Sequence, residues 1–266
     1  MNILHISDIH FRKEYLPAAS GYQEMLTRMH SPLIALEKCL TRILQQTTID
    51  LLIISGDLTE DGAIEDYRFL KKWLQQIIGK TEILVTLGNH DIKTNFRIGW
   101  CEEEPSLLPY NQVLDYPDFT IISFDNSCHG EADGVADAAQ FGWLRQTLAH
   151  LVNRPILLVT HHHLLTQQSS MPPWPGTETF LNLIAPYDIR CIFNGHTHHP
   201  FVGTVQKIPY FTAASMSFMG EDEGNGKVRF EEAYGYNFYC FDGSRLVHQA
   251  AENFKPGVLL TTLQMD

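Results

Sequence analysis

Five short segments of the sequence are rich in side chains that bind metal ions. Imidazole, carboxylate and amide oxygen suit zinc, iron or manganese, and the absence of cysteine from these segments argues against a soft-metal site. Eight of the 13 histidines lie in the segments or directly beside them. The segments are Asp8-Ile9-His10, Gly56-Asp57, Gly88-Asn89-His90-Asp91, His161-His162-His163 and Gly195-His196-Thr197-His198.

Each segment follows an apolar run that is typical of a buried β-strand, over residues 3–7, 51–55, 83–87, 156–160 and 189–193. The carboxyl ends of strands border the ligand crevice of α/β sheets. We therefore expect the five segments to converge on one site. In an extended segment, residues i and i+2 point to the same side. Asp8 with His10, and His196 with His198, can each present two ligands to one cluster.

Taken alone, each segment has an ordinary structural explanation. Asp-x-His or Gly-Asp after a strand is commonly a turn, residues 88–91 could form an Asx-type turn, and the triple histidine could be a surface cluster. The glycines before Asp57, Asn89 and His196 also fit sharp turns or close backbone approach. Five unrelated turns would have no reason to share ligand chemistry, so the pattern favours a common metal site.

In this order the segments resemble the motifs of the calcineurin-like metallophosphoesterase family: DxH, GD, GNH followed by Asp or Glu, HH and GHxH. The resemblance implies the family's α/β (αββα) fold, a β-sandwich of two mixed sheets flanked by helices. The C-terminal segment also resembles the branch that contains the class III cyclic nucleotide phosphodiesterases and related small phosphodiesterases. This second resemblance rests on Ala214-Ser215-Met216-Ser217 after a strand and on Tyr234-Gly235-Tyr236 before the last hairpin.

The family resemblance implies two metal ions, divalent or of mixed valence, for which iron, manganese or zinc is typical. One ion would be held by Asp8, His10, Asp57 and His198. The other would be held by Asp57, Asn89, His161 and His196, with Asp57 bridging the pair. The family pattern makes the first of the three consecutive histidines the ligand. His162 would then line the pocket, and His163 stands where relatives often carry proline.

Two residues of the third segment lie outside the implied ligand set. By resemblance, His90 would sit over the phosphate and stabilise the transition state or protonate the leaving oxygen. Asp91 would either orient a neighbouring imidazole or serve as the carboxylate of a structural turn. Two metals of this kind clamp a bridging hydroxide and the phosphoryl oxygens for in-line displacement.

Helical spacing of apolar residues predicts helices over 30–46, 64–78, 138–151 and 179–185. A further strand is expected over 119–124. After His199 this periodicity ends, and strands are expected over 201–205, 210–212, 236–241 and 246–250. Strands that follow an alternating β and α stretch suggest two packed sheets with outer helices. No linker or repeat divides the chain, so we expect a single domain over 1–266.

The 266-residue chain carries 19 basic and 31 acidic side chains, a formal charge of −12. This balance argues against a nucleic-acid partner. It does not argue against phosphate, because two divalent cations outweigh Asp8, Asp57 and a hydroxide. The five cysteines are widely spaced and form no CxxC pair, which indicates a reducing compartment. No run reaches a membrane span, and the N-terminus lacks signal-peptide features. We expect a cytoplasmic protein with no membrane partner.

The sequence therefore predicts a metal-dependent hydrolase of a small phosphodiester or phosphomonoester, in first place a cyclic-nucleotide-type or other small-molecule phosphodiesterase. The alternatives are a phosphomonoesterase or phospholipid-head-group phosphatase, and a non-catalytic scaffold of the same fold that binds a protein partner. Loops 92–112, 164–178 and 215–236 should wall the pocket. Their aromatic side chains could stack on a base or hold an apolar leaving group. These are Trp100, Trp174, Phe218, Tyr234 and Tyr236.

Overall fold

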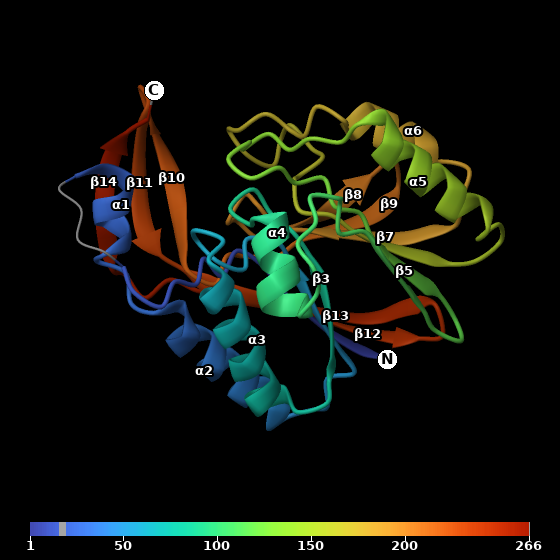
Figure 1. Cartoon of the computed structure of the whole chain (residues 1–266), viewed down its shortest axis with the longest axis horizontal. Helices are drawn as coiled ribbons and strands as arrows, with labels where there is room; N and C mark the ends of the chain where they lie inside the picture. Colours follow the sequence, from blue (N-terminus) through green and yellow to red (C-terminus); the bar gives the residue numbers. More distant parts are fainter. Residues whose placement is uncertain (16–19, 266) are drawn as a thin grey trace.

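Two large β-sheets pack face to face at the centre of the computed structural model, which describes residues 1–15 and 20–265 (Figure 1). The first sheet has the order β13-β12-β1-β2-β3. Strands β1, β2 and β3 are parallel, and β12 pairs with β1 in the antiparallel direction. The strands are β1 (Asn2–Ile6), β2 (Leu51–Ser55), β3 (Glu82–Thr86), β12 (Tyr234–Asp242) and β13 (Arg245–Phe254).

The second sheet has the order β4-β5-β6-β7-β9-β8. Its four inner strands run parallel, while β4 and β8 pair in the antiparallel direction at the two edges. Strands buried on both faces have continuous apolar sequences, as the predicted runs indicated. The strands are β4 (Gln112–Asp115), β5 (Thr120–Ser123), β6 (Ile156–Val159), β7 (Ile189–Asn194), β8 (Phe201–Val205) and β9 (Ile208–Thr212).

Helices cover the outer faces of both sheets. Helices α2 (Pro32–Leu44) and α3 (Ile64–Ile78) pack on the first sheet, and α5 (Ala138–Ala149) and α6 (Thr177–Ile184) pack on the second. A short helix α4 (Lys93–Phe96) continues into a π-helical turn, η1 (Arg97–Cys101). A third core lies between the sheets and includes Ile53, Leu157 and Phe193. The predicted αββα sandwich is thus confirmed. None of the helices in the described residues is long and apolar enough to cross a membrane.

A third, smaller sheet was not predicted. It has the order β10-β11-β14 and is packed against α1 (Gly21–Leu26), beside the main sandwich (Figure 1). Its strands are β10 (Phe218–Gly224), β11 (Lys227–Glu232) and β14 (Leu259–Gln264). The apolar residues of this unit form a separate core with Met25 and Leu26 of α1. Charged residues fill the second half of β10 and alternate with apolar ones along β11, and two threonines interrupt β14, so no continuous apolar run marked the sheet in the sequence.

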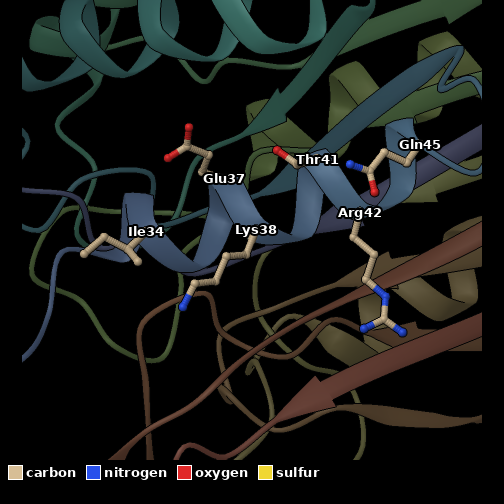
Figure 2. A pocket seen from close by; sticks show the side chains of 6 residues that line it. All are labelled: Ile34, Glu37, Lys38, Thr41, Arg42 and Gln45. Atoms are coloured by element: carbon tan, nitrogen blue, oxygen red, sulfur yellow. The ribbon is translucent and has the colours of Figure 1, made fainter.

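A groove runs along the outer side of α2 (Figure 2). Its Arg42 guanidinium reaches toward β13 and lies 3.2 Å from the Glu252 carboxylate. None of the candidate metal ligands lines this groove, so it is separate from the predicted site. The groove is lined by Ile34, Glu37, Lys38, Thr41, Arg42 and Gln45.

A histidine of β1, His5, is completely buried between the two large sheets. Its ring packs against Phe193 and Tyr239, and its Nε2 lies 2.8 Å from the hydroxyl of Ser55. Burial lowers the pKa of His5 from its ordinary 6.5 to about 3, because removal from water disfavours the imidazolium. The folded protein therefore holds His5 neutral throughout the mildly acidic range.

We expect this histidine to destabilise the fold in mild acid. Below pH 6.5 the unfolded chain protonates His5, whereas the folded chain does not until the pH approaches 3. The contribution of neutral His5 to the free energy of unfolding is present above pH 6.5 and is lost as the pH falls. The loss amounts to about 2 kcal/mol at pH 5. Urea unfolding measures how far the free energy of unfolding decreases from pH 7.5 to pH 5.0. This decrease should be about 2 kcal/mol smaller in His5→Phe than in the wild type. His248→Phe, which alters an exposed histidine of β13, should behave like the wild type. Equal losses in all three proteins would contradict the prediction.

Candidate metal centre

The five ligand-bearing segments meet at the carboxyl ends of β1, β2, β3, β6 and β7. The first group of side chains contains Asp8, His10 and His198. The Nε2 atoms of His10 and His198 are 3.1 Å apart, and Asp8 Oδ1 lies 3.5 Å from His198 Nε2. Oδ2 of Asp57 lies 3.7 Å from His10 Nε2. Asp8 and His10 follow β1, whereas His198 follows β7. The fold therefore brings together the first and the last of the five segments.

The second group contains Asn89, His161 and His196. His161 Nε2 lies 3.3 Å from Asn89 Oδ1 and 3.3 Å from His196 Nδ1. The same Oδ2 of Asp57 that faces His10 lies 3.4 Å from His161 Nε2. A single carboxylate oxygen therefore lies between the two groups. The other oxygen, Oδ1, accepts the backbone N–H of His90 at 2.8 Å, which orients the carboxylate.

The hydrogen bonds of the imidazoles determine which nitrogen atoms carry lone pairs. His10 Nδ1 lies 2.7 Å from Glu60 Oε2, and the Nδ1 atoms of His161 and His198 lie 2.7 Å from the carbonyls of Ser55 and Phe218. Each Nδ1 donates its hydrogen to these acceptors, so in the neutral imidazole, the form that binds a metal ion, each Nε2 is a bare acceptor.

These bare nitrogens face carboxylate oxygens and one another. Asp8 Oδ1 is buried and accepts no hydrogen bond from the described residues. Acceptor atoms that converge without hydrogens between them repel, unless a cation lies among them. Metal-bound histidines typically donate their second ring nitrogen to a carboxylate or carbonyl, as these do. The residues therefore fit two metal ions that share Asp57.

The carboxylates make the site attractive to positive charge. Burial by itself lowers the pKa of His10, but the hydrogen bond and charge of Glu60 outweigh it and raise the pKa to about 9. Burial likewise opposes protonation of His161, and Asp57 raises its pKa to about 9. At His198 burial dominates and lowers the pKa to about 4. Cations can replace the protons that these carboxylates otherwise hold on the imidazoles.

The backbone at the ligand residues is strained. Asp8, His10, Asp57, His196 and His198 all have φ between 49° and 71°. Side chains other than glycine rarely adopt this left-handed conformation, and such residues cluster where the surrounding structure overdetermines them at functional sites. The strain supports a functional rather than a merely structural role for these turns.

Glycines next to the ligands allow the loops to approach closely. A Cβ atom on Gly195 would lie 1.8 Å from Ser7 Oγ and 2.7 Å from Asp8 Oδ2, and one on Gly88 would lie 2.1 Å from Asp57 Oδ1. Close approach, one of the two explanations that the sequence allowed for these glycines, therefore holds here.

Gly195→Ala should accordingly lower stability by about 1–3 kcal/mol through overpacking, and should weaken metal binding because Asp8 must move. Gly142→Ala is a matched control, since Gly142 lies in α5 with no heavy atom near its Cβ position. That control should stabilise the protein by about 0.5–1 kcal/mol. Denaturant unfolding and metal titration of both variants check the prediction. An unaffected Gly195→Ala protein would contradict the assigned packing.

The side chain of His90 is more exposed than those of the ligand candidates His10, His161 and His198. Its Nδ1 donates to the Glu60 carbonyl at 3.0 Å, and its ring lies 4.6 Å from that of His10. About 28% of its side chain is accessible to solvent. The Nε2 atom is therefore the nitrogen of His90 that remains to contact a substrate.

Asp91 has the contacts of a turn carboxylate, the second of its two predicted roles. Its side chain accepts hydrogen bonds from the Gly88 and Leu58 backbone at 2.9 and 3.3 Å and from the Tyr67 hydroxyl at 2.8 Å. Burial and the nearby charge of Asp57 raise the pKa of Asp91 to about 6.

Glu60 is a carboxylate that contacts the Nδ1 atoms of two site histidines, and the sequence motifs did not identify it. It lies 2.7 Å from His10 Nδ1 and 3.5 Å from His90 Nδ1. The available signal was its position three residues after Asp57. Glu60 also has an acidic neighbour, Asp61, and adjacent acids are typical of solvated surface.

His162 lies beside the second group without contacting Asp57 or Asn89 through a hydrogen bond among the described residues. Its Nδ1 is 3.1 Å from Asn126 Oδ1, and its ring lies 4.5 Å from that of His196. The ring of His163 stacks on His196, and its Nε2 lies 3.2 Å from the Met171 carbonyl. His161 is thus the histidine of the three that faces the bridging position.

Burial excludes substrate contact, one of the possibilities for the loop aromatics, for three of the five residues, and a fourth stacks on a neighbouring strand. Trp100, Trp174 and Tyr236 are buried in the helix-facing cores, and Tyr234 stacks on Phe254. Their apolar surface is used for packing the loops. Phe218 does reach the site, where its ring lies 4.6 Å from His198 and 5.2 Å from His10.

Sequence relatives of the chain are phosphodiesterases by name. A probable cyclic nucleotide phosphodiesterase of Xenorhabdus bovienii is 26% identical over 203 residues, 75% of this chain and 81% of that protein. One of Psychrobacter arcticus is 24% identical over 277 residues, 96% of this chain and 91% of that protein. A probable glycerophosphodiester phosphodiesterase of Arcobacter nitrofigilis is 28% identical over 182 residues, 63% of each chain.

Solved structures share the fold. A dimetal phosphatase of Danio rerio superposes with a TM-score of 0.59 at 11% identity, covering 94% of this chain and 98% of that one. A purple acid phosphatase of yellow lupin gives 0.61 at 14% identity, covering 98% of this chain and 52% of that one. The family model described as calcineurin-like phosphoesterase matches residues 1–200, which contain all five ligand-bearing segments. The chain therefore belongs to the calcineurin-like phosphoesterase family, whose members are metal-dependent hydrolases.

Proposed function

We propose that the protein is a two-metal phosphodiesterase that hydrolyses a small, cyclic-nucleotide-type phosphodiester. The observation that carries the proposal is the pair of ligand groups that share Asp57 Oδ2. The relatives named as cyclic nucleotide phosphodiesterases favour the substrate class. Two metal ions at such a site supply a nucleophile at neutral pH and stabilise charge on the attacking and leaving oxygens.

The residues divide into two ligand sets. We assign Asp8, His10, Asp57 and His198 to one ion, and Asp57, Asn89, His161 and His196 to the other, with iron, manganese or zinc as the occupants. Glu60 fixes the tautomer and orientation of His10. His162 lies beside His196 and borders the second set.

His90 acts on the leaving group in this proposal. Its Nδ1 is engaged by the Glu60 carbonyl, so its Nε2 is the nitrogen that can give a proton to the leaving oxygen. A group placed in this way typically contributes about 10²–10⁴-fold to the rate.

We also propose the domain organisation, the class of partner and the cellular compartment. We assign residues 1–266 to a single domain, because β12 pairs directly with β1. The formal charge of −12 favours a small phosphate ester over nucleic acid. The widely spaced cysteines favour the reducing cytoplasm.

Metal removal tests the function. Protein treated with a chelator should lose activity, then bind two equivalents of Mn²⁺ and regain turnover. Each filled site should stabilise the fold by about 2.7 kcal/mol at a free metal concentration 100 times its Kd. The compounds to be assayed are cyclic nucleotides, glycerophosphodiesters, phospholipid head-group esters and phosphomonoesters. Absence of turnover with manganese, iron and zinc would refute the proposal. Faster hydrolysis of monoesters than of diesters would favour the phosphatase alternative.

A further inference from the structure

Residues 214–218 lie against the metal centre although they are outside the matched family region of 1–200. This segment follows β9 and forms a parallel bridge between Ser215 and Ser7, directly before the ligand Asp8. Ser215 and Ser217 are both buried. A buried hydroxyl is energetically costly unless it is hydrogen-bonded, so both serine hydroxyls should have partners within this segment or at Asp8.

Both hydroxyls lie on one carbonyl oxygen. Ser215 Oγ and Ser217 Oγ are each 3.0 Å from the carbonyl of Asp8, and 2.8 Å from one another. Ser215 Oγ also accepts the backbone N–H of Ser217 at 3.0 Å and of Phe218 at 3.3 Å. Its lone pairs are thereby used, so its own hydrogen is donated to Asp8. The backbone N–H of Met216 approaches the same carbonyl at 3.2 Å.

This carbonyl belongs to a strained peptide. Asp8 has φ of 52°, a left-handed conformation that side chains other than glycine rarely adopt. The conformation directs the Asp8 side chain so that Oδ2 accepts the His196 backbone N–H at 3.0 Å and Oδ1 faces His198. Hydrogen bonds to the carbonyl resist relaxation of this peptide and keep the carboxylate in place.

The segment of residues 214–218 also contacts His198, another ligand candidate of the group that contains Asp8. Phe218 O accepts Nδ1–H of His198 at 2.7 Å, and Ser215 N–H donates to the His198 carbonyl at 3.2 Å. The second metal set differs in this respect. The hydrogen-bond partners of His161 outside its own set are Ser55, Asn126 and Gly195, and none of them belongs to residues 214–218.

We propose that Ser215 and Ser217 are positioning residues for one half of the metal centre, the half formed by Asp8, His10 and His198. Their hydroxyls hold the Asp8 peptide in its left-handed conformation, so metal affinity at this half depends on the C-terminal segment. The inference rests on the dinuclear centre proposed above.

The test is a calorimetric Mn²⁺ titration of full-length, metal-free protein. The double variant Ser215→Ala/Ser217→Ala should weaken one binding step by about 10- to 100-fold, the usual effect of removing a partner that orients a metal ligand. The other step should stay within about threefold of the wild type. The weakened step should be the one that His198→Gln abolishes and Asn89→Ala leaves. The variant Ser217→Thr keeps a hydroxyl at both positions, so its affinity at that step should match that of the wild type.

Ser123→Ala is the matched control. Ser123 is also buried at the end of a strand, and its hydroxyl donates to the Val85 carbonyl at 3.3 Å, which belongs to no ligand residue. This variant should lose comparable stability and keep both binding steps. If the double variant does not fold, Ser217→Ala alone should weaken the same step by at least about threefold.

The outcomes separate the two claims. Two wild-type binding steps in the double variant, or equal weakening of both steps, would overturn the positioning role while leaving the dinuclear centre intact. A wild-type protein that binds no metal would overturn the centre itself and this inference with it. Selective weakening in the double variant, with wild-type affinity in Ser217→Thr, would support the assignment.

Discussion

Replacing Asp57 with asparagine is expected to lower kcat/KM by at least about 1000-fold, equivalent to about 4 kcal/mol of transition-state stabilisation. Oδ2 of Asp57 lies 3.4 Å from His161 Nε2 and 3.7 Å from His10 Nε2, so it is the atom common to both ligand groups. The asparagine oxygen can keep the hydrogen bond from the His90 backbone. Its NH₂ group would then point at the position that both cations need.

The Asp57→Asn variant should also lose metal affinity. Calorimetry with Mn²⁺ and steady-state kinetics on a model diester measure the two effects, and circular dichroism confirms the fold. Asp118→Asn, which makes the same chemical change in an exposed loop, should match the wild type in both assays. A rate for Asp57→Asn within about threefold of the wild type would exclude a bridging role.

His90→Gln is expected to lower kcat by about 10²–10⁴-fold while two metal ions remain bound. This separation follows from the geometry. His90 Nδ1 contacts Glu60 and not the bridging oxygen of Asp57, and the ligand groups are complete without it. An enzyme should therefore lose rate without losing metals, whereas a non-catalytic scaffold should show no change.

The leaving group tells whether His90 supplies a proton. Esters of p-nitrophenol need little protonation on departure, so His90→Gln should slow their hydrolysis less than that of an alkyl or cyclic nucleotide ester. His248→Gln, on the exposed face of β13, provides the control. Equal losses for both ester types would remove the proton-donor role and leave electrostatic stabilisation of the transition state. Full activity in His90→Gln would argue against any catalytic role.

The large elements of the fold were predictable because their residues carry a regular pattern. Helix α3 was expected over 64–78 and extends over Ile64–Ile78, since Leu70, Leu74 and Ile78 recur at helical spacing on its buried side. Strand β2 was likewise predicted at its observed bounds. The β10-β11-β14 sheet was missed for the opposite reason. Its few core residues, such as Phe230 and Leu260, stand in strands where charged residues or threonines interrupt the apolar sequence, and their burial depends on the distant helix α1.

For the site, the sequence by itself determined which chemical groups are available and where along the chain they stand. Ligand-type residues after five buried strands, together with parallel strand direction, are enough to predict that Asp57 and His161 share a site. Tertiary structure alone decided which atoms face one another. The contact between Glu60 and His10 spans 50 positions in the chain, and that between Ser215 and Asp8 spans 207. Local patterning encodes which side chains are buried, but a hydrogen bond between distant segments depends on how the sheets pack, so the partners in these two contacts could not be predicted from the sequence alone.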